Sequence, residues 1–99
     1  MSTEAYIIKQ VRRAILEALN MTYPSGMFLD SLFRVILGVD PTYDKILFVK
    51  DVTYLVEKKY IEFAASPISQ QIFSKRIARL TPNGKEIADQ TMTDKALEI

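Results

Sequence analysis

The sequence predicts one α+β domain, a three-helix bundle followed by a β-hairpin and a last helix. Up to about residue 59, apolar residues recur at the three- and four-residue spacings of helices. Over residues 60–80, apolar and polar residues alternate as in strands, and Thr81-Pro82 then signals a new helix. We expect residues 1–99 to form a single domain with its core over about 4–90, and 91–99 to extend the last helix or fray.

The first helix is expected over residues 4–20. Thr3 is the expected N-cap, and the Tyr-Pro-Ser-Gly sequence at 23–26 is a strong turn signal beyond its end. An apolar stripe runs along this helix, while Arg12, Arg13 and Glu17 fall outside it. The stripe consists of Ile8, Val11, Ile15, Ala18 and Leu19.

Residues 27–29 are short and apolar, which predicts either a brief strand or the approach to a second helix. Asp30 or Ser31 is expected to cap that helix, and Gly38 to end it after Leu37. Its expected core residues are Leu32, Phe33, Val35 and Ile36.

The third helix is expected over about 41–59, with Asp40 as N-cap and Pro41 as its first residue. Its expected apolar stripe is Phe48, Val49, Val52, Leu55 and Val56.

The remaining elements are a hairpin and a short helix. Residues 60–65 and 72–80 are expected strands, because β-branched and aromatic residues are frequent there, and the polar segment 66–71 joins them. Thr81 is the expected N-cap of the last helix and Pro82 its first residue.

The composition argues against catalysis and against a resident metal or cofactor. The chain has no cysteine and no histidine, so disulfides, the usual zinc ligands and His-paired nucleophiles are excluded. Asp40 and Asp44 are a carboxylate pair, but turn and helix-capping roles explain them best. The three glycines are scattered and form no phosphate-binding loop. We therefore expect a non-enzymatic protein without a cofactor.

The ends of the chain and its charge bear on location and partners. No apolar run approaches about 18 residues, and the N-terminal residues lack a basic segment, so we expect a cytoplasmic protein without a membrane association. The formal net charge is +1, so any binding to nucleic acid depends on how the basic residues cluster.

Two motifs, with the order of the elements, resemble the winged helix-turn-helix superfamily. Residues 51–61, Asp-Val-Thr-Tyr-Leu-Val-Glu-Lys-Lys-Tyr-Ile, resemble the end of the recognition helix and the next strand in MarR-type and PadR-type regulators. Lys59 stands where those families often have glycine. Residues 79–87, Arg-Leu-Thr-Pro-Asn-Gly-Lys-Glu-Ile, are similar to the junction of wing and last helix. In its small size and in the Tyr-Pro sequence after the first helix, the chain also resembles short winged-helix proteins encoded in Mu-like prophages.

The resemblance implies a double-stranded DNA-binding transcriptional regulator, with the third helix in the major groove and the hairpin, or wing, on the backbone. Helical spacing turns Tyr43, Leu47, Lys50, Tyr54 and Glu57 outward, and the long stem of Lys45 carries its ammonium to the surface. The residues carried over as DNA-binding are Thr42, Tyr43, Lys45, Lys50 and Tyr54, the wing-tip residues Ser69, Gln70 and Gln71, and the wing-strand residues Lys75, Arg76 and Arg79.

The resemblance also implies a homodimer, formed through the first helix and the C-terminal segment. Tyr6, Ile7, Met92 and Leu97 supply apolar surface for it, but the same residues could instead close the core of a monomer.

The alternative function is a winged-helix protein–protein interaction module or adaptor that does not bind DNA. The near-neutral charge favours it, and so do Tyr43 and Tyr54, because aromatic residues on a helix face are common interface anchors. Ile46 and Leu47 favour it as well, because a DNA-reading face rarely needs two aliphatic residues, although a thymine methyl group can be contacted that way. Asp44, Asp51 and Glu57 on or near the same helix would repel phosphate. The basic residues of the wing strands also have an ordinary explanation as edge protection.

Overall fold

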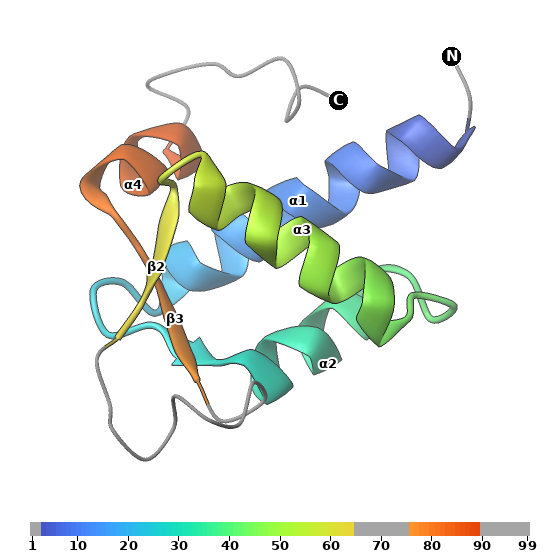
Figure 1. The fold of residues 1–99 in the computed structure, drawn as a ribbon, viewed down its shortest axis with the longest axis horizontal. Helices are drawn as coiled ribbons and strands as arrows, with labels where there is room; N and C mark the ends of the chain where they lie inside the picture. The colour runs from blue at the N-terminus through green and yellow to red at the C-terminus, as the bar shows by residue number, and fades with distance from the viewer. Residues whose placement is uncertain (1–2, 65–75, 90–99) are drawn as a thin grey trace.

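The computed structural model describes residues 3–64 and 76–89. In chain order, its elements are α1 (Thr3–Met21), β1 (Met27–Phe28), α2 (Leu29–Val39), α3 (Lys45–Glu57), β2 (Ile61–Phe63), β3 (Ile77–Leu80) and α4 (Pro82–Ala88) (Figure 1). The predicted α+β class and order of elements are confirmed. Within the described ranges, no helix combines the length and the apolar character that a membrane crossing requires.

The three strands form one antiparallel sheet in the order β1-β3-β2. β3 pairs with β2 through Ile61 and Leu80 and with β1 through Met27 and Ala78, so residues 27–28 are a strand and not merely an approach to α2. Gly26 makes this pairing possible. Its φ is +83°, and a Cβ there would lie 2.1 Å from the carbonyl oxygen of Ala78.

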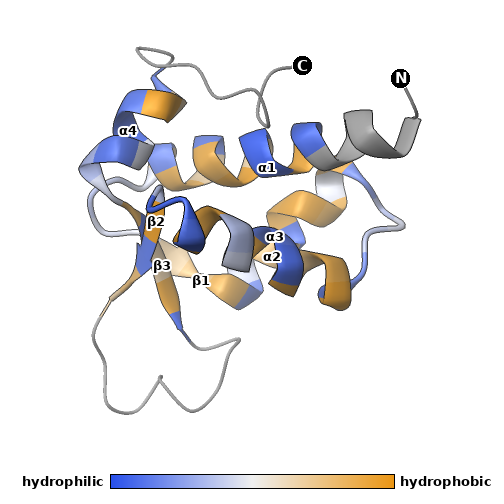
Figure 2. Cartoon of the chain, turned by 45° about the horizontal axis from the view of Figure 1, so that its top comes forward, coloured by the Kyte–Doolittle hydropathy of each residue, from blue (hydrophilic) through white to orange (hydrophobic). Residues whose placement is uncertain are grey.

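The core lies where α1 packs against α2, α3, α4 and β3. Hydrophobic and hydrophilic residues alternate along α1 (Figure 2), as expected for a helix with one buried face. The fully buried large side chains are Val11, Ile15, Leu16, Leu19, Leu29, Leu32, Ile36, Val52, Leu55 and Ile61. Most of the predicted stripes therefore reach the core, and Leu16 and Leu29 join them.

Val35 and Val49 were predicted in the core, and this is wrong. They are 44% and 42% exposed, respectively. Each follows or precedes a buried residue directly in its helix, and one residue turns the side chain by about 100° around the axis. The neighbouring Ile36 and Phe48, which were also predicted in the core, are buried.

The ends of α2 differ from the prediction. The helix begins at Leu29, so neither Asp30 nor Ser31 is the N-cap. The backbone N–H of Leu29 donates to the carbonyl of Arg76 (2.9 Å), which gives one of the free N–H groups of the first turn a partner. Gly38 does not end α2 but lies inside it, and the C-cap is Asp40.

The start of α3 also differs, by four residues. The carboxylate of Asp40 accepts hydrogen bonds from the backbone N–H of Thr42 (3.1 Å) and from its hydroxyl (2.7 Å), which holds residues 40–42 in a turn. Asp44 is the N-cap instead, and accepts from the N–H of Leu47 (2.9 Å). The predictions of Asp40 as cap and Pro41 as first helical residue are therefore wrong.

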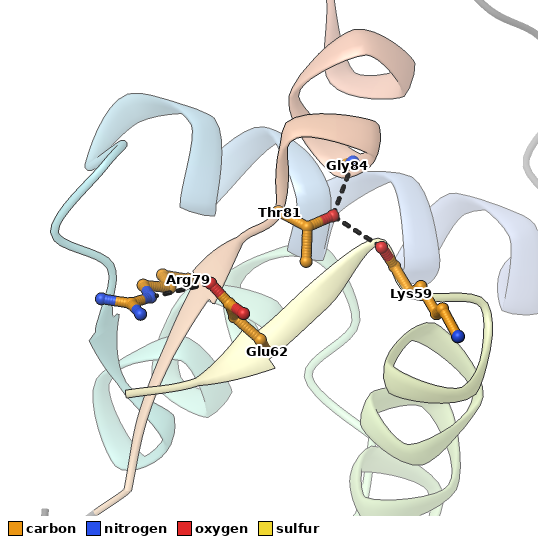
Figure 3. A network of polar contacts seen from close by, with 5 residues as sticks. All are labelled: Lys59, Glu62, Arg79, Thr81 and Gly84. Carbon is orange, nitrogen blue, oxygen red and sulfur yellow. Dashed lines mark hydrogen bonds and ion pairs between the residues drawn. The ribbon is translucent and has the colours of Figure 1, made fainter. Parts of the chain in front are cut away.

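The junction of α3, β2 and α4 follows both predicted motifs (Figure 3). Lys59 adopts φ +64°, the left-handed conformation that favours glycine after the end of a helix. The hydroxyl of Thr81 donates to the carbonyl of Lys59 (2.6 Å) and accepts from the N–H of Gly84 (3.0 Å), which confirms Thr81 as the N-cap of α4. One threonine thus connects the end of α3 to the start of α4.

A second polar cluster connects the end of α1 to the end of α4. The side-chain amide of Asn20 donates to Asp89 (3.0 Å) and its oxygen accepts from Lys85 (2.7 Å). The hydrogen bonds from Asn20 and Lys85 hold the pKa of Asp89 below its ordinary value. These contacts orient α4 on the side of α1 away from the site described next.

Candidate nucleic-acid interface

α3 presents one face to the core and the opposite face to solvent. Phe48, Val52 and Leu55 are buried. On the opposite side, the exposed residues Ile46, Lys50, Thr53 and Glu57 follow one another at three- and four-residue spacing, with Val49 beside them. We call these five residues the outer face of α3. At 1.5 Å per residue, the 13 residues of α3 make a rod of about 20 Å.

Three of the predicted DNA-binding residues are exposed at the start of α3 or within it. Lys45 is exposed in the first turn, where its ammonium lies 5.9 Å from the ring centroid of Phe33 on α2, and Lys50 is part of the outer face. Thr42 lies in the turn before α3, with its hydroxyl bonded to Asp40. Their exposure agrees with the prediction, and their role in binding DNA stays a prediction.

Tyr43 was predicted to face outward, and this is wrong. Its ring is 6% exposed and packs among aromatic residues, with centroids 6.2 Å from Phe33 and 6.4 Å from Phe48. Its hydroxyl donates to the carboxylate of Asp51. Burial and this carboxylate raise the pKa of Tyr43 above its ordinary value. Because α3 begins at Lys45, Tyr43 lies in a turn, where helical spacing says nothing of its direction.

Tyr54 was also predicted to face outward, but Arg12 of α1 covers it. The guanidinium carbon of Arg12 lies 3.7 Å from the centroid of the Tyr54 ring, the geometry of a cation–π contact. Tyr54 is half-buried as a result. It lies at the border between α1 and α3, and its contribution to a DNA contact stays a prediction.

A buried polar cluster underlies this border, and sequence reasoning missed it. Arg12 Nε donates to Asp51 Oδ1 (3.1 Å), and the hydroxyl of Tyr43 donates to the other carboxylate oxygen. Asp51 is 5% exposed. Arg12 and Asp51 are 39 residues apart in the sequence, so no local pattern could have predicted their contact. The available signal was an aspartate at a helix position between apolar core residues.

This cluster changes the electrostatics of α3. Asp51 was expected to repel phosphate, but it points inward and is compensated by Arg12. The carboxylate of Asp44 is engaged as the N-cap, and Glu57 lies in the last turn of the helix. The outer face therefore carries two charged residues, Lys50 in its middle and Glu57 in the last turn of the helix.

The two wing-strand arginines that the structure describes have partners within the sheet. Arg79 Nε lies 3.1 Å from a carboxylate oxygen of Glu62, across the β2–β3 pair (Figure 3). The guanidinium of Arg76 lies 5.3 Å from the ring centroid of Phe63. The other predicted wing residues, Ser69, Gln70, Gln71 and Lys75, lie outside the described residues.

Exposed apolar side chains also occur near this site. Val35 and Val39 are exposed on α2, and Leu47 is exposed on α3. The two helices lie side by side (Figures 1 and 2), and the rings of Phe33 and Phe48 join them at a centroid distance of 5.3 Å. Among the described residues, no group of three potential metal ligands is present.

Comparison with known proteins supports the fold. No family model and no curated protein matches the sequence. Among solved structures, the chain is similar to one described as the crystal structure of SSV1 F-93, with a TM-score of 0.58, 16% sequence identity, and coverage of 80% of this chain and 79% of that chain. The match confirms the predicted winged helix-turn-helix fold, in which α1–α3 are the helical bundle and β2 and β3 are the strands of the wing.

Proposed function

We propose that this winged-helix domain binds double-stranded DNA, with the outer face of α3 in the major groove and the wing on the backbone. The observation that carries the proposal is the charge distribution on α3. Lys45 and Lys50 are exposed, whereas Asp51 is buried against Arg12 and Tyr43. The exposed lysines in the first half of α3 match the phosphates that line the groove, whereas Glu57 lies at the other end of the helix.

The dimensions of the helix suit this role. The major groove is about 12 Å wide and admits an α-helix. Lysines on such a helix contact phosphates and set its position on the duplex. Arg12 stabilises the helix from the α1 side through Asp51 and Tyr54, so the outer face is presented by a fixed scaffold.

The wider proposal is a transcriptional regulator that acts without catalysis and without a cofactor. A homodimer formed through α1 and the C-terminal segment would place two copies of α3 on successive half-sites. The likeness to small prophage winged-helix proteins and a cytoplasmic location are part of the same proposal.

A protein-binding module is the second candidate function. Exposed apolar side chains favour it, since Val35 and Val39 lie four residues apart on α2 and Leu47 is exposed on α3. This candidate predicts no affinity for DNA at low salt.

An anisotropy titration tests the proposal against this alternative. The protein is added to a labelled random-sequence duplex at several salt concentrations. We expect the logarithm of the binding constant to fall linearly with the logarithm of the salt concentration, with a slope of about −0.9 for each phosphate contact. Absence of binding at low salt, or binding that does not depend on salt, would contradict the proposal.

A further inference from the structure

The outer face of α3 is apolar where a major-groove helix would meet base edges. Ile46 is 70% exposed and Val49 is 42% exposed. Thr53, one helical turn further along, is exposed as well and adds a methyl group. Contact of these two side chains with a partner would remove apolar surface from water, which favours binding.

Apart from its lysines, the same helix lacks the side chains that most often read purines by paired hydrogen bonds. Its sequence, KILFVKDVTYLVE, contains no arginine, asparagine or glutamine. Those residues make the bidentate contacts to guanine and adenine in the major groove. Lys45 and Lys50 are point charges on flexible stems, which suit phosphates. Two of the five residues of the outer face, Ile46 and Val49, are aliphatic, so apolar contact is one means of discrimination between bases that this helix offers.

The major groove offers one apolar group at base edges, the C5-methyl group of thymine. We infer that α3 recognises thymine methyl groups, with Ile46 and Val49 making the contacts and the flanking lysines matching the phosphate charge. This inference rests on the proposed function and names the DNA chemistry that it selects. It also explains aliphatic residues on a face that carries positive charge.

Substitution of uracil for thymine isolates the methyl group. An alternating A·T duplex and its A·U counterpart have the same charge and the same base-pair hydrogen bonds. We expect the wild-type protein to bind the thymine duplex more tightly, by about fourfold for each methyl group in contact. The I46A/V49A double variant is expected to bind both duplexes equally, near the wild-type affinity for the uracil duplex.

Val35→Ala is the matched control, because Val35 is exposed to a similar degree but lies on α2. It should retain the preference for thymine. Circular dichroism checks that all variants keep their helices. Equal wild-type affinity for both duplexes, with normal salt dependence, would overturn the inference and leave the proposed function intact. A preference for the thymine duplex that survives in I46A/V49A would also overturn the inference, because the protein would then be responding to a difference in duplex shape and not to contact with the methyl groups. Failure to bind either duplex would contradict both proposals.

Discussion

Replacing Asp51 by alanine is expected to lower the free energy of unfolding by about 3 kcal/mol. The change leaves the guanidinium of Arg12 without its carboxylate and the buried hydroxyl of Tyr43 without its acceptor. The side chain of Arg12 is 20% exposed and keeps some contact with water, which places the loss at the lower end of the range for broken buried pairs. Urea denaturation followed by circular dichroism measures it.

Arg13→Ala is the control for this prediction. Arg13 is the next residue of α1 and forms an i,i+4 pair with the exposed Glu17 at 3.2 Å. A surface pair of this kind contributes about 0.3–0.5 kcal/mol. A loss in Asp51→Ala as small as that in Arg13→Ala would show that the buried cluster does not hold α3 against α1.

The second large effect is expected at Gly84, in the first turn of α4. A Cβ there would lie 1.8 Å from the carbonyl oxygen of Tyr60, which also accepts a hydrogen bond from the N–H of Thr81 (3.0 Å). The obstacle is backbone, so α4 or the start of β2 has to move. We expect Gly84→Ala to cost about 1–3 kcal/mol or more, measured as a lower melting temperature.

Gly38→Ala is the matched substitution, and its expected effect on stability has the opposite sign. Gly38 lies inside α2, and a Cβ there would meet no atom within 4 Å. Alanine in a helix interior is more stable than glycine by about 0.5–1 kcal/mol, so the melting temperature should rise. A lower melting temperature in Gly38→Ala, or an unchanged one in Gly84→Ala, would contradict the packing described for these two positions.

The sequence predicts the elements well because they depend on local patterns. Periodicity identifies the helices, and the threonine and proline at 81–82 place the start of α4 correctly. The start of α3 was predicted four residues too early, because the Asp-Pro pair at 40–41 has the local pattern of a helix start. The side chain of Asp40 bonds to Thr42 instead, and no local pattern shows this choice.

The site was harder to predict than the fold, because it depends on contacts between distant residues. An outward Tyr43 followed from a helix that began too early, and its true partner Asp51 was taken for an exposed acid. Arg12 was placed outside the apolar stripe of α1 correctly, but nothing near it in the sequence indicates a partner on α3. Exposure of Lys50 was predicted from helical spacing, and exposure of Lys45 from the length of its side chain.

The central claim is that α3 contacts DNA, and removal of one charge from its outer face tests it most directly. Lys50→Ala and Arg13→Ala each remove one positive charge, but Arg13 lies on α1 beside Ile87 and Ala88 of α4. In the salt-dependent titration of the random duplex, we predict that Lys50→Ala weakens binding and reduces the magnitude of the salt slope by about one, while Arg13→Ala leaves it unchanged. Equal slopes for Lys50→Ala, Arg13→Ala and the wild type would contradict the claim.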